Sequence, residues 1–140
     1  MQTEFAFVDT FNMVQDVRDF QAKFGIPKHS VPVFDKPVLD FRVRFLKEEL
    51  DETIAAAEAG DLVEVADGLT DILYVAIGAM VSLGLPIEAL WKEVHSTNMK
   101  KEVAPPGSPC WKHCVKPEGW EKPRIEWQLV LAGFDKEASK

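Results

Sequence analysis

The sequence has little cysteine and little positive charge, and each shortage excludes a class of protein. Two cysteines in 140 residues, Cys110 and Cys114, are too few for the disulfide framework of a small secreted domain. Sixteen Lys and Arg against 23 Asp and Glu give a net charge of −7, which argues against a protein that binds nucleic-acid backbones. A small phosphorylated substrate stays compatible with this charge if divalent cations and a few lysines offset the repulsion.

The sequence also lacks a clear targeting or membrane segment. Its longest apolar stretch, ILYVAIGAMVSLGL at 72–85, is short for a membrane span and is flanked by acidic residues. The first ten residues, MQTEFAFVDT, have neither the basic start nor the apolar run of a secretory signal. Internal repeats and low-complexity tracts are absent as well. We therefore expect a cytoplasmic protein with no membrane partner.

What the sequence does contain is helical periodicity. It predicts a first helix from Glu4 to Phe24, in which Phe7, Phe11, Val14 and Val17 recur at helical intervals before Gly25 and Pro27 stop it. Three further helices are predicted at 40–60, with Asp40 as N-cap, at 61–83, with Asp61 as cap, and at 86–101. The prolines at 32 and 37 predict a loop at 28–37.

The last third of the chain is different in composition. Residues 102–127 hold five prolines and three tryptophans, which predicts an extended arm with short strands at 113–116 and 125–131. We expect one all-α domain, in which 1–104 form a four-helix bundle and 105–140 its arm. Such a bundle is thin, and its third helix is apolar nearly all round, so we expect oligomerisation to complete the core, as a homodimer or a dimer of dimers.

The second helix carries an acidic cluster that is poorly explained as a solvated face. At about 100° per residue, one face is apolar and a second is mixed in charge. The apolar face comprises Val43, Leu46, Leu50, Ile54 and Ala57, and the mixed face Arg44, Lys47, Asp51 and Glu58. Glu48, Glu49 and Glu52 fall in a third sector, together with Phe41 and Phe45. This helix is therefore expected to be covered on two sides.

The third helix has a matching set of acids. Glu64, Asp67 and Asp71 stand at i, i+3 and i+7 and so share one face, which Gly68 and Gly78 continue with space for a ligand. Buried carboxylates are costly unless they are paired, protonated or bound to metal. Carboxylate oxygen is the ligand that Mg²⁺ and Mn²⁺ prefer. The two acidic faces thus predict a divalent-cation site. The alternative is a set of acids that complement helix dipoles and pair with basic residues of another subunit.

These motifs resemble a known family. EELDE (48–52) has the form E-E-x-x-E and EVAD (64–67) the form E-x-x-D, as in the all-α nucleoside triphosphate pyrophosphohydrolases. That superfamily includes MazG-like proteins, dimeric dUTPases and phosphoribosyl-ATP pyrophosphohydrolases. VHSTNMKK (94–101) is similar to a segment of MazG-like members, and VKPEGWEKP (115–123) to a tail of the phosphoribosyl-ATP branch.

The chain departs from the phosphoribosyl-ATP branch at two places. Lys112 and His113 stand where that branch usually has Gly-Lys, and Asp71 stands near the position of a histidine motif that is missing here. The resemblance therefore favours nucleotide house-cleaning over histidine biosynthesis. A phosphoribosyl-ATP pyrophosphohydrolase-like activity and a non-catalytic helical oligomerisation module with an acidic interface are the alternatives.

The resemblance implies Mg²⁺-dependent cleavage of a nucleoside triphosphate between its α and β phosphates, with Mn²⁺ as a substitute. It implies that Glu49, Glu52, Glu64 and Asp67 bind the metal, and that Glu48 orients and deprotonates the attacking water. The residues expected to bind substrate are Asp71, Asn98, Lys100, Lys101, Lys116 and Trp120, with Arg124 and Tyr74 as further candidates.

One rival metal site has to be considered. Cys110, His113 and Cys114 are all possible zinc ligands, with His95 or an acid as a fourth. Their spacing fits no familiar zinc pattern. A regulatory protein that binds a divalent cation or zinc is the third alternative.

Overall fold

The computed structural model describes residues 11–110 and 112–138, and this part of the chain is mostly helical. The elements are α1 (Met13–Lys23), α2 (Lys36–Glu58), α3 (Leu62–Ser82), α4 (Ile87–Met99), β1 (Glu102–Val103), β2 (Cys114–Val115) and α5 (Ile125–Leu131). The structure agrees with the predicted all-α class. Glu4, where the first helix was predicted to start, lies outside the described residues, as does Phe7. Trp111 of the arm also lies outside them.

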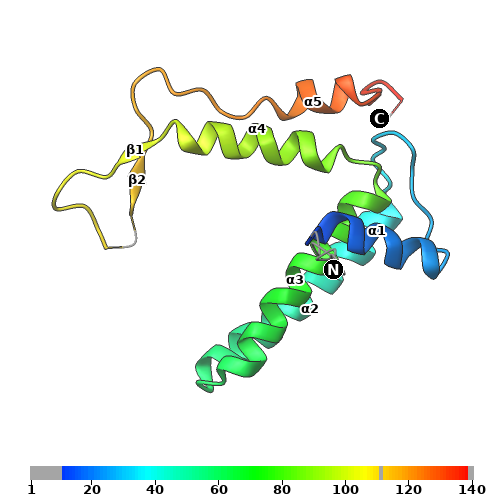
Figure 1. Cartoon of the computed structure of the whole chain (residues 1–140), viewed down its shortest axis with the longest axis horizontal. Coiled ribbons are helices and arrows are strands. Elements are labelled where there is room, and N and C mark those ends of the chain that lie inside the picture. Colours follow the sequence, from blue (N-terminus) through cyan, green and yellow to red (C-terminus); the bar gives the residue numbers. More distant parts are fainter. Residues whose placement is uncertain (1–10, 111, 139–140) are drawn as a thin grey trace, which may run out of the picture.

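Helices α2 and α3 form an antiparallel pair along most of their length (Figure 1). Gly60 adopts a positive φ of 70° in the tight connection, a backbone conformation that residues with a Cβ rarely adopt. Asp61 then caps α3, because its carboxylate accepts hydrogen bonds from the backbone N–H groups of Val63 and Glu64. The predicted bounds of the third helix are confirmed.

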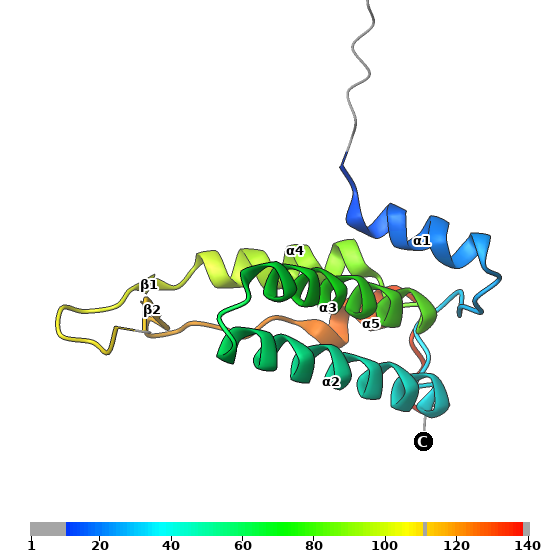
Figure 2. The same cartoon turned by 90° about the horizontal axis from the view of Figure 1, so that it is seen from below.

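Helix α3 is the centre of the helical body. It contacts α2 along one side and α1 along another (Figure 2). Val17 of α1, Val81 of α3 and Ile87 of α4 form the buried core cluster, to which Val14, Ile77 and Met80 add partly buried side chains. This core fixes α1 on the second half of α3, while α2 runs along both halves.

The predicted start of the second helix at Asp40 is wrong, because α2 begins at Lys36. Asp35 is the N-cap, and its carboxylate accepts a hydrogen bond of 3.2 Å from the Val38 backbone N–H. Pro37 therefore stands in the first turn, where its missing N–H costs no helical hydrogen bond. The first helix likewise begins at Met13, after the N-cap Asn12, so Phe11 precedes it.

Most of the apolar stripe predicted for the core side of α2 is exposed in the single chain, and Leu46 is its half-buried member. Val43, Leu50 and Ile54 are each about half exposed, at 54%, 49% and 48%. α2 instead turns Arg42, Leu46, Glu49, Thr53 and Ala56 toward α3, all of which are buried or half-buried. α3, predicted to be buried nearly all round, also exposes an apolar side, which comprises Leu62, Val63, Leu69 and Leu73.

Among the described helices, α3 is long and apolar enough to cross a membrane by length and composition alone. This is weak evidence, because the core helix of a soluble protein has the same two properties. The contacts of α3 with α1 and α2 account for part of its apolar character, while Leu62, Val63, Leu69 and Leu73 stay exposed in the single chain.

The arm differs from its prediction at 125–131, where the structure has the helix α5 and not a strand. Glu93 of α4 holds this segment, since its carboxylate accepts hydrogen bonds from the Arg124 backbone N–H at 2.8 Å and from Gln128 Nε2 at 3.2 Å. The strand at 113–116 is confirmed as β2, which pairs antiparallel with β1, a strand that the sequence did not predict. Helix α4 ends at Met99, two residues before the predicted Lys101.

Candidate active site

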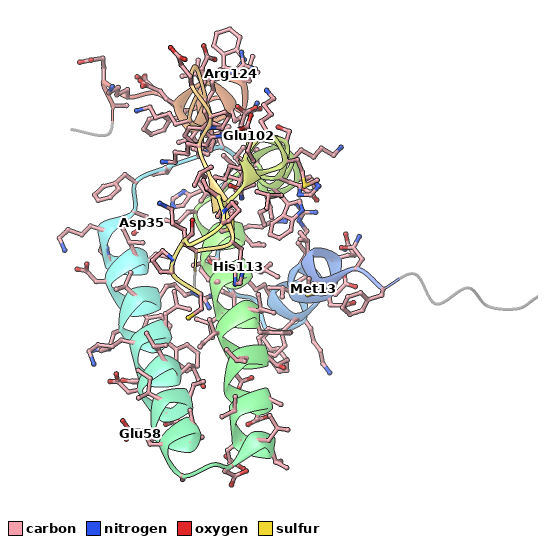
Figure 3. The ribbon with its side chains drawn as sticks, turned by 90° about the vertical axis from the view of Figure 1, so that its left-hand side faces the viewer. Met13, Asp35, Glu58, Glu102, His113 and Arg124 are labelled. Atoms are coloured by element: carbon pink, nitrogen blue, oxygen red, sulfur yellow. The ribbon has the colours of Figure 1, made fainter. Side chains whose placement is uncertain are left out.

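The E-E-x-x-E motif of α2 and the E-x-x-D motif of α3 lie beside a tight contact between the two helices. Thr53 and Gly68 are both buried there, and a Cβ added to Gly68 would lie 2.1 Å from Thr53 Oγ1. Thr53 Oγ1 donates a hydrogen bond of 2.7 Å to the backbone carbonyl of Glu49. Figure 3 shows the pair side by side, from Asp35 at the start of α2 to Glu58 at its end. Gly68 thus gives room to Thr53 of α2, and not to a ligand as the sequence predicted.

Glu49 is the half-buried member of the acidic cluster. Loss of solvent around its carboxylate raises its pKa above the ordinary value, and the nearby charges of Asp71, Glu52, Asp67 and Glu48 raise this pKa further. Acids from two helices therefore act on one carboxylate. The helix pair brings together five of the six acids that the sequence singled out.

The sixth, Glu64, lies at the outer edge of this cluster. It stands in the first turn of α3, where its backbone N–H donates to Asp61, and it does not contribute to the raised pKa of Glu49. Its side chain and those of Glu48, Glu52, Asp67 and Asp71 are exposed. The cluster is therefore an open acidic face with Glu49 as its most enclosed member.

The donor chemistry of this face fits a hard divalent cation. Within residues 11–110 and 112–138, none of the six acids forms an ion pair with a Lys, Arg or His; the ion pairs of α2 involve Asp40 and Asp51, which lie elsewhere on the helix. The side-chain atoms that these acids offer to a metal are all carboxylate oxygens, the ligand type that Mg²⁺ and Mn²⁺ prefer. The single described chain does not close any three acidic, His or Cys side chains into a metal-binding group.

A cavity of about 220 Å³ adjoins the acidic face, between α1, α2 and α3. Glu49 and Asp71 line it on the side of the acids, and Phe20, Phe45 and Tyr74 supply aromatic walls. The rings of Phe20 and Tyr74 meet edge to face, with centroids 5.5 Å apart. The site therefore combines an anionic edge with a partly apolar pocket.

Two polar residues of this pocket, Gln21 and Arg42, were missed by the sequence reasoning. The sequence did carry a signal for both. Gln21 follows Val17 by one turn on the buried side of α1, a position where the helical period predicts an apolar residue. Arg42 precedes Glu49 by two turns and shares its face of α2.

The predicted substrate-binding residues of the arm form a second group. The indole N–H of Trp120 donates to the backbone carbonyl of Thr97 at 3.0 Å. The ammonium groups of Lys116 and Lys101 lie 4.6 Å and 5.7 Å from the centroid of the Trp120 ring. Trp120 thus ties the arm to the end of α4, near which Asn98 and Lys100 also lie.

The arm group and the acidic face are separate within one chain. The β1–β2 hairpin lies beyond the end of α4 and clear of the α2–α3 pair in both Figure 1 and Figure 2. Asp71 is the one predicted substrate-binding residue that lies with the acids, and it lines the cavity beside Glu49. Lys100, Lys101, Lys116 and Asn98 do not join it.

The rival zinc ligands are not assembled in the described part of the chain. Cys110 and Cys114 are exposed free thiols, and Cys114 belongs to β2, where it pairs with Val103 of β1. No group of three His, Cys, Asp or Glu side chains includes them among the residues that the structure describes.

Comparison with known families adds to this geometry. Residues 17–98, more than half of the chain, match the phosphoribosyl-ATP pyrophosphohydrolase family. The chain belongs to this family. It is thereby a member of the all-α nucleoside triphosphate pyrophosphohydrolase superfamily, which confirms the resemblance seen in the two acidic motifs. The matched region includes α2, α3 and most of α1 and α4. The match supports pyrophosphohydrolase activity, which is hydrolysis of an acid anhydride.

A curated relative is found in a virus. The chain is 30% identical over 91 residues to an uncharacterized protein of Acanthamoeba polyphaga mimivirus. The aligned region covers 61% of this chain and 36% of the viral protein. The chain thus corresponds to little more than a third of the length of that relative.

Proposed function

We propose that the chain is a Mg²⁺-dependent nucleoside triphosphate pyrophosphohydrolase that converts (d)NTPs to the monophosphate and pyrophosphate, in nucleotide-pool house-cleaning. The observation that carries this proposal is the convergence of uncompensated carboxylates from α2 and α3 on Glu49, beside a pocket. A phosphate chain could lie along the acidic face while the nucleoside enters the pocket.

In this proposal Glu49, Glu52, Glu64 and Asp67 hold the cation. A bound Mg²⁺ supplies charge neutralisation for the phosphates and acidifies the attacking water. Glu48, exposed at the edge of the cluster, orients the water in line with the α-phosphorus and accepts its proton. Asp71, at the entrance of the pocket, binds the sugar of the substrate.

Phosphate-binding cations come from a second subunit in this proposal. Lys101 and Lys116 flank Trp120 at the end of α4, in a group separate from the acids of the same chain. The exposed apolar faces of α2 and α3 support association of copies, since burial of these side chains would complete the core. A homodimer or a dimer of dimers would then bring the arm of one copy, with Asn98 and Lys100, to the acids of another.

A second candidate activity is hydrolysis of phosphoribosyl-ATP, and the family match favours it. This substrate has the same α–β phosphoanhydride as a nucleoside triphosphate, so the same acidic face would serve. Asp71 and the Lys112-His113 pair are the positions at which the chain departs from that branch.

Pyrophosphate release distinguishes these activities. The purified protein is assayed with each common NTP and dNTP and with phosphoribosyl-ATP, with and without Mg²⁺. We expect Mg²⁺-dependent pyrophosphate release from at least one nucleoside triphosphate. Turnover of phosphoribosyl-ATP alone would support the second candidate. Absence of turnover on every substrate, with no Mg²⁺-dependent rise in Tm, would contradict both and favour a non-catalytic oligomerisation module.

A further inference from the structure

Among the residues that the structure describes, Gln21 has a buried acceptor without a partner. Its side chain, only 3% exposed, lies in the wall of the pocket between α1, α2 and α3. Its Nε2 donates a hydrogen bond of 2.9 Å to the backbone carbonyl of Gly78, while Oε1 has no partner among the described residues. A buried acceptor left unpaired costs free energy, so this atom requires a donor from elsewhere.

The orientation of this carboxamide is fixed by its surroundings. If the amide were flipped, Oε1 would face the carbonyl oxygen of Gly78, and two acceptors would repel each other. A Cβ on Gly78 would lie 3.1 Å from Gln21 Nε2, so the absence of a side chain there lets the amide approach the α3 backbone. At the wall of the pocket, Gln21 thus leaves its acceptor, and not its Nε2, without a partner among the described residues.

Arg42 of α2 places hydrogen-bond donors near this acceptor of α1. Its guanidinium also lies 3.1 Å from the position of a Cβ on Gly78, so both polar groups border the same glycine. Arg42 donates to Ser82 Oγ at 3.3 Å and forms no ion pair with a carboxylate in the described part of the chain. The remaining N–H groups of this half-buried cation are therefore donors for a ligand.

The size and walls of the pocket limit what it can hold. At about 220 Å³ it is smaller than the usual site of a drug-sized ligand, so it suits one flat ring system and not a whole nucleotide. Phe20, Phe45 and Tyr74 offer aromatic faces and edges to such a ring. Glu49 and Asp71 lie at the same cavity, so a ring held inside can be joined to phosphates on the acidic face.

We infer that this pocket binds the nucleobase of the substrate and that Gln21 determines base specificity, by accepting a hydrogen bond from a ring N–H or an exocyclic amino group. Arg42 donates to the neighbouring carbonyl or ring nitrogen of the same base. The inference rests on the proposed function, which it deepens by assigning the residue that recognises the base.

The test compares Gln21→Met with wild type in steady-state hydrolysis of the four common NTPs and their dNTP counterparts. Methionine keeps the length of the side chain and removes both the acceptor and the Nε2 donor to Gly78. We expect kcat/KM for the preferred nucleotide to fall about tenfold, mainly through KM, because one hydrogen bond to the base is lost. The ratio of kcat/KM between the best and the worst nucleotide should fall by the same factor. The inhibition constant of inorganic tripolyphosphate, which has no base, should stay unchanged.

Gln15→Met is the matched control, because Gln15 lies on the exposed side of α1, where it bonds to Asp19. It should leave both discrimination and tripolyphosphate inhibition as in wild type. If Gln21→Met does not fold, Gln21→Asn, which withdraws the amide by one methylene, replaces it with the same expected loss.

Two results would overturn the inference. The first is wild-type discrimination in the Gln21 variant, which would refute the role of Gln21 while the hydrolase function stands. If wild type hydrolyses no nucleotide, calorimetric titration with the free nucleosides decides. Nucleoside binding that is lost in the variant supports the base pocket independently of catalysis, and its absence in wild type is the second refuting result.

Discussion

At the scale of single residues, loss of solvent and the charges of neighbouring acids act together on the carboxylate of Glu49. The folded protein holds the Glu49 proton more tightly than the unfolded chain, because the pKa is raised. Its carboxyl group therefore favours folding below the ordinary carboxyl pKa, and this contribution is lost as the pH rises through the raised value. We expect Glu49→Gln to raise the Tm of the metal-free protein near pH 7, and this gain to vanish near about pH 4.

With Mg²⁺ present, wild type should have the higher Tm and Glu49→Gln the lower. Wild type should gain Tm on addition of Mg²⁺ and the variant much less, and turnover should fall about 100-fold or more, since outer partners of metal ligands alone contribute about 10- to 100-fold. Asp51→Asn, on the charged face where Asp51 pairs with Lys47, is the control and should show neither effect. Equal Tm and equal turnover for wild type and Glu49→Gln would place the site elsewhere.

At the scale of elements, the contact between Thr53 and Gly68 sets how closely α2 and α3 approach. Gly68→Ala adds a Cβ 2.1 Å from Thr53 Oγ1, and overpacking of this kind costs about 1–3 kcal/mol. The better helix propensity of alanine returns about 1 kcal/mol. We expect a net loss of up to about 2 kcal/mol in the free energy of unfolding, measured by urea titration. The double variant Thr53→Ala/Gly68→Ala should recover much of it. A Gly68→Ala variant more stable than wild type would contradict this contact, because helix propensity alone would then decide the outcome.

The sequence predicted helices better than it predicted what they face. Asp61 and Gly84 bound α3 correctly, because caps and stops are local signals. The wheel of α2 failed at Val43, Leu50 and Ile54, because hydrophobicity marks a side that will be covered and does not say by which partner. The arm at 125–131 has strand-forming residues, but its contact with Glu93 of α4 makes it helical.

The candidate site shows the same difference between what local sequence patterns predict and what tertiary packing decides. The spacing of the two acidic motifs was sufficient to predict that Glu49, Asp67 and Asp71 come together, because short loops and helical periods fix their faces. Gln21 and Arg42 reach the pocket only through the tertiary packing of α1 and α2 around α3, which no local pattern encodes. Their polar side chains on buried helix faces were the one available signal.

At the scale of the whole molecule, the separation of acids and arm lysines in one chain predicts active sites shared between copies. In a symmetric dimer, Glu49 of one copy and Lys101 of the other would serve the same site. Glu49→Ala and Lys101→Ala should each be nearly inactive alone. After the two variants are mixed, co-refolded and allowed to associate at random, half of the dimers carry both, and each of these has one intact site, so about a quarter of wild-type turnover should return.

The readout is pyrophosphate release before and after subunit exchange, with the oligomeric state followed by light scattering. Leu50→Glu places a charge on the exposed apolar face of α2 and should give monomers that neither complement nor turn over substrate, whereas Lys47→Glu on the charged face should leave assembly intact. Recovery in the mixture requires that residues of two chains meet at one site, because each parent lacks one of them. If the mixture stays as inactive as its parents while dimers form, the lysines and the acids act within one chain, and the arm must fold back onto its own acidic face during turnover.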